Sequence, residues 1–309
     1  MSAISPMLAC GLDNLEDLRF PCLVSLKLDG CLALIVDGVV QTRSGKPFPS
    51  ETVQKLFGRS DLNGLVGEII VGPPNVPTTF NTTTGAVRAK KLPAGVTEEM
   101  FHFYVYDYWD STSVYCERQH LIEDVVVYYS KSDNKNITIL KQEWCESYEE
   151  LLELEKTALE MGYEGLIARD PYGFYKNGRC TPKSQTLVKV KRFQQDEATI
   201  IGVEELMHNE NVATTNELGY TERSGHKENL VGGNTLGALV CKTQCGVEFR
   251  IGTGFSAAQR KQLWKMKDSL IGEIVTFKSF TVGEMNGVPR LPVAKNISEF
   301  IGLRMKEDM

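Results

Sequence analysis

The 309-residue sequence contains no apolar run that approaches the length of a membrane-spanning helix, which is ~20 residues. Residues 1–11 lack the basic segment followed by an apolar segment that is typical of a secretion signal. Internal repeats and low-complexity tracts are also missing. These absences argue against a helical membrane span and a secretion signal, and we expect a cytoplasmic protein with no membrane partner.

Close groups of metal-ligating side chains are scarce as well. The four histidines show no ligand spacing, and Cys241 and Cys245 are the only close pair among eight scattered cysteines. A zinc site needs a second pair of cysteines or histidines near the first. The sequence therefore predicts reduced thiols and no zinc site.

Net positive charge is lacking too. The formal charge is -6 at pH 7, whereas proteins that bind duplex nucleic acid need cationic surface to displace counterions. Cations are nevertheless concentrated locally, at Arg88, Lys90 and Lys91 and again between Arg169 and Arg192. Each cluster is either a solvated face or a phosphate-binding surface.

What the sequence does contain is a lysine near the end of an apolar run, in Lys27-Leu28-Asp29-Gly30. Residues 22–28 are predicted to form a strand, whose period of two places Lys27 on the polar face with Ser25 and Asp29. That lysine is either solvated beside an Asp-Gly turn or a nucleophile in a pocket.

Further polar residues follow in an order that would complete a nucleotidyl-transfer site. They are Arg43, Glu68, Tyr106, Arg118, Glu164, Lys189 and Lys191. Glu68 and Glu164 are carboxylates in otherwise apolar strands, where an unpaired charge is costly, so both need cationic company. Alternation in the strand at 187–191 places Lys189 and Lys191 on one face.

Regular structure is indicated in both halves of the chain. Strands are predicted at 23–28, 33–36, 65–71 and 102–108, and later at 198–203, 236–242, 248–252 and 273–280. A helix is predicted from Tyr148 to Met161, after a capping box of Ser147 and Glu150, and another near 256–268. Residues 192–196 are expected to form the domain hinge, and 207–234 a long mobile loop.

The order of these residues resembles that of the covalent nucleotidyltransferase superfamily, and within it the small ATP-dependent DNA ligases of phages and bacteria. The resemblance covers nearly the whole chain. Its C-terminal part depends on segments 249–255, 272–278 and 287–292, which look like the oligonucleotide-binding (OB) barrel of DNA ligases. It implies an α+β fold: an antiparallel-sheet, ATP-grasp-like nucleotidyltransferase domain at 1–192, then an OB-fold β-barrel at 193–309.

The resemblance also implies roles for individual residues. Lys27 would attack ATP and carry AMP before the AMP passes to a DNA 5′-phosphate, with Lys189 and Lys191 assisting. Tyr106 would stack on adenine, and Glu68 and Glu164 would hold Mg²⁺ (or Mn²⁺). The implied nucleotide-binding set is Lys27, Arg43, Glu68, Tyr106, Glu164, Lys189 and Lys191, and the expected DNA contacts are Arg88, Lys90, Lys91, Arg118 and Arg290.

The sequence departs from the family at two positions in the motif. Leu32 stands where these ligases usually carry arginine, and Ser25 where many carry glutamate. Adenine selection and one phosphate contact are therefore left open. Arg290 and Arg304 are both candidates for the C-terminal arginine motif.

The predicted function is thus sealing of 5′-phosphate, 3′-hydroxyl nicks in duplex DNA by a monomer, in replication, repair or phage DNA processing. If a phage encodes the protein, its compartment is the host-cell cytoplasm. Alternatives are an RNA ligase, a capping-type nucleotidyltransferase or a catalytically silent nucleic-acid-binding module. The barrel segments favour the DNA ligase.

Overall fold

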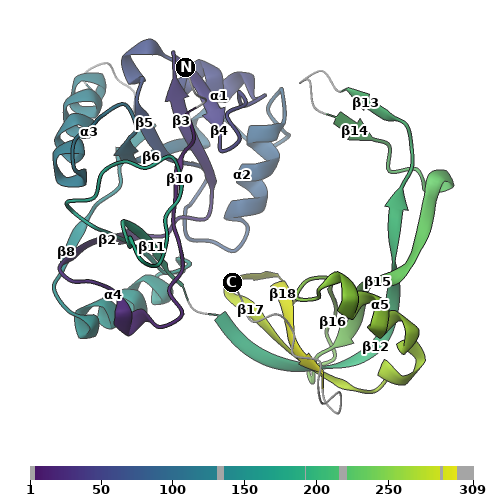
Figure 1. The fold of residues 1–309 in the computed structure, drawn as a ribbon. Coiled ribbons are helices and arrows are strands. Elements are labelled where there is room, and N and C mark those ends of the chain that lie inside the picture. The colour runs from purple at the N-terminus through teal and green to yellow at the C-terminus, as the bar shows by residue number, and fades with distance from the viewer. Residues whose placement is uncertain (1–3, 131–135, 192, 216–220, 286–287, 298–309) are drawn as a thin grey trace. The chain divides into compact units, whose positions relative to one another are not determined.

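The computed structural model describes residues 4–130, 136–191, 193–215, 221–285 and 288–297. The chain divides into two compact units, residues 1–191 and 192–309. Figure 1 shows the strands and helices of both units. Buried side chains form two main hydrophobic cores in the first unit and a separate core in the second.

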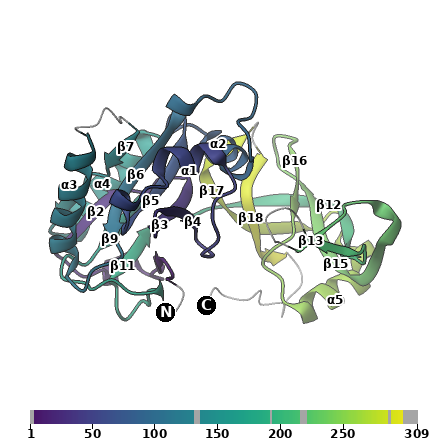
Figure 2. The same cartoon turned by 90° about the horizontal axis from the view of Figure 1, so that it is seen from above.

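The first unit contains a five-stranded sheet in the order β4-β3-β5-β6-β7. Its strands are β3 (Cys31–Val36), β4 (Val39–Thr42), β5 (Leu65–Val71), β6 (Phe101–Tyr108) and β7 (Ile137–Ile139). The helices α1 (Glu51–Phe57), α2 (Thr79–Arg88) and α3 (Tyr115–Ser130) contribute to the same core. Figure 2 shows α2 near β3 and β5, while α3 covers β6 and β7.

A second sheet in the same unit has the order β11-β9-β2-β8. Its strands are β2 (Cys22–Leu26), β8 (Glu143–Cys145), β9 (Leu166–Arg169) and β11 (Leu187–Val190), and β1 (Met7–Leu8) pairs with β10 (Gly178–Arg179) beside it. The alternate residues Val24, Ala168 and Val188 share a core with α4 (Tyr148–Glu160). The intervening residues, Ser25 and Ile167 among them, face the opposite way.

The predicted strands and the helix at 148–161 in this unit are confirmed to within a few residues. Ser147 caps α4 by accepting a hydrogen bond from the Glu150 backbone. The turn after β3 occurs at Asp37 and Gly38, which both have positive φ.

The second unit is a five-stranded antiparallel sheet in the order β16-β15-β12-β17-β18. Its strands are β12 (Phe193–Asn209), β15 (Leu230–Lys242), β16 (Glu248–Ile251), β17 (Ile274–Met285) and β18 (Val288–Ile297). The predicted helix is α5 (Ala257–Lys265), which packs on β15. The strand number and the helix agree with an OB-like domain. The described residues do not close the sheet into a barrel, since an isolated bridge at Thr253 and Val293 takes the place of a full ladder.

The prediction of a long loop at 207–234 is wrong. β12 and β15 stay paired as far as Asn209 and Leu230, and the hairpin of β13 (Ala213–Thr215) and β14 (Thr221–Arg223) lies at the end of this ribbon (Figure 1). The buried Asn211 side chain donates 2.9 Å hydrogen bonds to the carbonyl oxygens of Ser224 and His226. Because these bonds satisfy the polar backbone, a segment rich in Asn, Thr and Gly forms regular structure.

Among the described residues, no helix has both the length and the apolar content to cross a membrane.

Candidate active site

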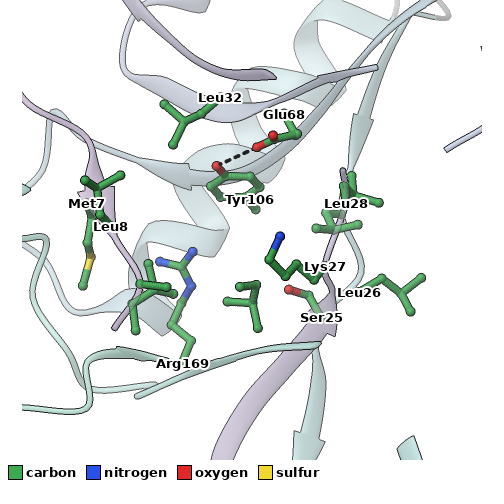
Figure 3. Close-up of a pocket in the computed structure, with 14 residues that line it drawn as sticks. Met7, Leu8, Ser25, Leu26, Lys27, Leu28, Leu32, Glu68, Tyr106 and Arg169 are labelled. Carbon is green, nitrogen blue, oxygen red and sulfur yellow. Dashed lines mark hydrogen bonds between the residues drawn. The ribbon is translucent and has the colours of Figure 1, made fainter. Parts of the chain in front are cut away.

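A pocket lies in the first unit, and its two main walls come from the two sheets. The β2, β9 and β11 side contributes Ser25, Ile167, Arg169 and Leu187, with Lys27 just after β2. The five-stranded sheet contributes Leu32, Glu68 and Tyr106, whose side chains alternate with those packed under the helices. Met7 and Leu8 complete one edge (Figure 3), and Ala9 also lines the pocket. The pocket is therefore largely apolar with a few convergent polar groups, as expected of a small-molecule site.

Lys27 is positioned by the end of β2. Its backbone nitrogen donates a 2.9 Å hydrogen bond to the carbonyl oxygen of Gly165, just before β9. β2 ends at Leu26, and the four consecutive residues from Ser25 to Leu28 all line the pocket. The side chain of Lys27 is 23% exposed, and a solution-facing surface lysine is thereby ruled out.

Glu164 bridges two lysines. One carboxylate oxygen accepts a hydrogen bond from Nζ of Lys27, and the other accepts a 2.9 Å bond from Nζ of Lys191. Burial opposes ionisation of Glu164, but the two ammonium groups outweigh burial and lower the pKa of its carboxyl group. The need for cationic partners, predicted for a carboxylate in an apolar strand, is met here by Lys27 and Lys191.

The glycine of the Lys27 motif is required by a close approach. A Cβ atom on Gly30 would lie 2.4 Å from the carbonyl oxygen of Ile69 and 2.4 Å from a side-chain carbon of Ile70. Gly30 therefore lets the chain after Lys27 pass directly over β5, next to Glu68.

Glu68 and Tyr106 form the polar part of the opposite wall. The Tyr106 hydroxyl donates a 3.4 Å hydrogen bond to the Glu68 carboxylate (Figure 3). Burial raises the pKa of Glu68 to about 7, since Lys27 and the Tyr106 hydroxyl do not offset burial and the nearby Asp29 charge. The main-chain oxygen of Tyr106 accepts bonds from the Tyr115 hydroxyl (3.0 Å) and Gln119 (3.3 Å), which fix the strand.

Four members of the predicted nucleotide-binding set, Arg43, Glu164, Lys189 and Lys191, are not among the residues that line this pocket in the described structure. Glu164 is joined to the pocket by its ion pair with Lys27. Arg43 is exposed in the turn after β4, and Lys189 is half-buried in β11, where its backbone pairs with Cys10. Lys191 reaches the site through Glu164.

The predicted DNA contacts differ in exposure. Arg88, Lys90 and Lys91 are exposed at the end of α2 and just beyond it. Arg290 is half-buried in β18, and Arg304 lies outside the described residues.

The position of Arg118 in the structure differs from the predicted one. Its side chain is fully buried, and its Nε donates a 2.7 Å hydrogen bond to the Asp107 carboxylate. Its Nη1 donates to the main-chain oxygens of Ser113 and Gly173. A guanidinium enclosed in this way cannot reach a DNA phosphate, so the predicted DNA contact of Arg118 is wrong and its role is to hold the fold.

Sequence reasoning missed Arg169 as a pocket residue. It ends the apolar strand β9, is 4% exposed, and shares the Asp107 carboxylate with Arg118 through a 2.5 Å hydrogen bond. A charge in an apolar strand is the signal that identified Glu68 and Glu164, and it applies equally to Arg169.

Comparisons with known proteins identify the family of the chain. Residues 6–191 match the family model of the ATP dependent DNA ligase domain, and residues 232–297 match the DNA ligase OB-like domain. A Chlorella virus DNA ligase-adenylate structure is 32% identical, with a TM-score of 0.54, over 99% of this chain and 100% of that one.

Two other structures share the fold at lower identity. A Lig E DNA ligase is 22% identical with a TM-score of 0.67, over 95% of this chain and 98% of that one. The ATP-dependent DNA ligase of bacteriophage T7, in complex with ATP, is 16% identical with a TM-score of 0.52, over 94% of this chain and 97% of that one. A comparison with curated proteins found no match.

The chain belongs to the ATP-dependent DNA ligase family. It is an enzyme that forms phosphodiester bonds in DNA at the expense of ATP.

Proposed function

We propose that Lys27 is the residue that becomes adenylylated, and that the product seals nicks in duplex DNA. The Lys27 ammonium group first loses a proton to solvent, and the neutral nitrogen then attacks the α-phosphorus of ATP, so that a phosphorus–nitrogen bond forms and the bond to pyrophosphate breaks. The AMP then moves to a DNA 5′-phosphate, and the adjacent 3′-hydroxyl displaces it to form the phosphodiester. The observation that carries this proposal is a half-buried lysine in a pocket beside a carboxylate that two lysines share.

The wall residues suit the parts of AMP. Tyr106 supplies a flat aromatic face on which a purine can stack, and Ile167 supplies an apolar surface in the same pocket. Glu68 lies between the Tyr106 hydroxyl and Lys27, where a carboxylate would bind ribose hydroxyls. Arg43 and Lys189 do not line the pocket in the described structure, so these side chains would have to move when ATP binds in order to contact its phosphates.

Magnesium is the metal that the family implies, and the donor set fits it. Mg²⁺ is held in such enzymes by one or two carboxylates together with substrate phosphates, and no cluster of three acidic, cysteine or histidine ligands occurs among the described residues. Glu68 and Glu164 would supply the carboxylates. Bound there, the ion would stabilise charge on the phosphate oxygens.

Glu164 would become available to a metal when Lys27 reacts. Both of its oxygens accept hydrogen bonds from lysines in the free protein. Adenylylation of the Lys27 nitrogen removes the positive charge of that side chain. The Glu164 carboxylate oxygen that was paired with Lys27 then loses its ion pair. The chemistry of the first step thus prepares the site for the second.

The remaining parts of the proposal concern partners and setting. The expected substrate is nicked duplex DNA, bound by a monomer, with the exposed cluster of Arg88, Lys90 and Lys91 as one contact surface. All eight cysteines are free thiols, which is consistent with the reducing cytoplasm of a cell or of a phage host.

The test is nick sealing on matched substrates. We expect the protein to seal a nicked DNA duplex with ATP and Mg²⁺, and to fail with NAD or GTP. Faster sealing of a nicked RNA duplex would contradict the assignment to DNA.

A further inference from the structure

The N-terminal segment, residues 4–9, forms one wall of the pocket with very little regular structure of its own. Met7, Leu8 and Ala9 line the pocket, and Figure 3 shows Met7 and Leu8 on the side opposite Lys27. The strand β1 in this segment has two residues and pairs in parallel with β10. Because so short a parallel ladder contributes little stability, contacts made by side chains must help to hold this wall in place.

One of these contacts is made by Tyr175, in the loop between β9 and β10. Its hydroxyl oxygen accepts a 3.2 Å hydrogen bond from the backbone nitrogen of Met7. Its ring packs against the same buried cluster as Leu32 and Tyr106, which line the pocket from the five-stranded sheet. The guanidinium carbon of the buried Arg118 lies 5.6 Å from the centre of the ring. Tyr175 thus ties the N-terminal wall to the wall that carries Tyr106.

Tyr175 is not among the residues that line the pocket in the described structure, so loss of its hydroxyl would leave the lining intact. Met7 is 6% exposed, and a buried N–H group without an acceptor is costly. Without the hydroxyl, the segment would therefore leave its place in part of the molecules. ATP would then have to order this wall as it binds, and the cost of ordering lowers affinity.

We propose that Tyr175 is a positioning residue, whose hydroxyl holds Met7 in place before ATP binds and thereby sets the affinity of the pocket for ATP. Tyr175 acts through the backbone of Met7 and not by contact with the nucleotide. This inference rests on the proposed function, in which the pocket binds the ATP that modifies Lys27.

The experiment measures single-turnover labelling by α-labelled ATP, as a function of ATP concentration, for the unaltered protein and Tyr175→Phe. The substitution removes the hydroxyl group and keeps the ring. We expect the ATP concentration that gives the half-maximal rate to rise by about 3- to 10-fold, the typical effect of one hydrogen bond. The rate at saturating ATP should stay within about twofold, because the ATP-bound arrangement is the same.

Tyr172→Phe is the matched control. It removes a tyrosine hydroxyl from the same loop, where the side chain is 67% exposed and does not line this pocket. Both the ATP dependence and the maximal rate should be unchanged in this variant.

Hydrogen exchange of the Met7 amide gives a second readout, which a role of Tyr175 in packing alone would not change. In the unaltered protein this amide should be protected before ATP is added. In Tyr175→Phe it should exchange faster, and saturating ATP should restore its protection.

An ATP dependence that is unchanged in Tyr175→Phe would overturn the role of Tyr175 and leave the proposed function intact. A lower maximal rate with the same ATP dependence would overturn it as well. If Tyr175→Phe does not fold, an unprotected Met7 amide in the unaltered protein without ATP would still contradict the inference. Absence of any covalent label from ATP on the unaltered protein would overturn the proposed function, and this inference with it.

Discussion

At the scale of single residues, the site depends on one carboxylate shared by two lysines. Glu164 holds Lys27 and Lys191 at the pocket in the free protein. The sequence predicted that Glu164 needs cations, since the residues that follow it are apolar, but could not identify them, because the pairing joins residues 137 and 27 positions apart. In the structure Glu164 lies just before β9 and not within it. Ion pairs over such separations are set by the packing of strands.

Removing the Glu164 charge should therefore impair positioning and metal binding together. We expect Glu164→Gln to reduce the rate of Lys27 adenylylation by about 100-fold, typical of losing a preorganised electrostatic contact. Higher Mg²⁺ should restore part of the activity if coordination contributes. The measurement is the rate of covalent labelling across a Mg²⁺ titration, and a rate close to that of the unaltered protein at low Mg²⁺ would argue against both roles.

The raised pKa of Glu68 predicts a pH dependence. Its carboxyl group has a pKa of about 7 in the folded protein, above its ordinary value near 4.5. Ionised Glu68 is needed to bind ribose or metal, so kcat/KM for adenylylation should rise with pH through about 7. Because the folded state favours the protonated form, the contribution of Glu68 to stability is present at low pH and is lost as pH rises through about 7.

The control for this profile is Glu68→Gln, which cannot ionise. In that variant the rising limb near pH 7 should disappear, although overall activity will be low. If the rising limb of the pH profile persists unchanged in Glu68→Gln, the ionisation that causes it belongs to another group, such as the attacking amine.

At the scale of elements, local patterns predicted strands well and polar segments poorly. The strands of the first unit and the helix at 148–161 follow from hydrophobic periodicity and a capping serine. The segment 79–88 contains four threonines and a glycine, yet forms α2. Thr83, Ala86 and Val87 are buried there, and the Thr83 hydroxyl accepts a 2.9 Å hydrogen bond from the Val71 backbone. Packing on β5 thus outweighs a weak helix propensity.

The basic cluster that follows α2 should act in DNA binding and not in the chemistry of Lys27. Changing Arg88, Lys90 and Lys91 together to Ala should weaken binding to nicked duplex and make the affinity less dependent on salt, by roughly 0.9 log units per log unit for each lost phosphate contact. Covalent labelling by ATP should stay nearly unchanged, because these side chains do not line the pocket in the described structure.

A matched control removes three exposed lysines elsewhere on the same unit, Lys55, Lys141 and Lys156. The two triple variants then have the same net charge. A difference between them in DNA affinity or in its salt dependence therefore reports a local contact of the cluster with DNA. Identical salt dependence in the cluster variant and the unaltered protein would refute the DNA contact and direct attention to the β12–β15 ribbon.

At the scale of the whole molecule, the order of motifs predicted the ligase family, although net charge argued against a nucleic-acid enzyme. The sequence could not predict that β12 and β15 extend as a paired ribbon, because Asn, Gly and Thr are typical of loops. Nor could it show that Arg118 is buried, since an arginine in a polar helix is usually solvated. Both corrections arise from hydrogen-bond partners outside the local segment, namely Ser224 for Asn211, and Asp107 and Gly173 for Arg118.

Whether Lys27 carries AMP is tested most directly by one measurement. The protein is incubated with α-labelled ATP and Mg²⁺, digested, and the modified residue is located by mass spectrometry, in parallel with Lys27→Ala and Lys189→Ala. We predict AMP on Lys27, no label on a folded Lys27→Ala protein, and detectable label on Lys189→Ala. An acid-labile adduct on another residue, or a labelled Lys27→Ala protein, would contradict the account.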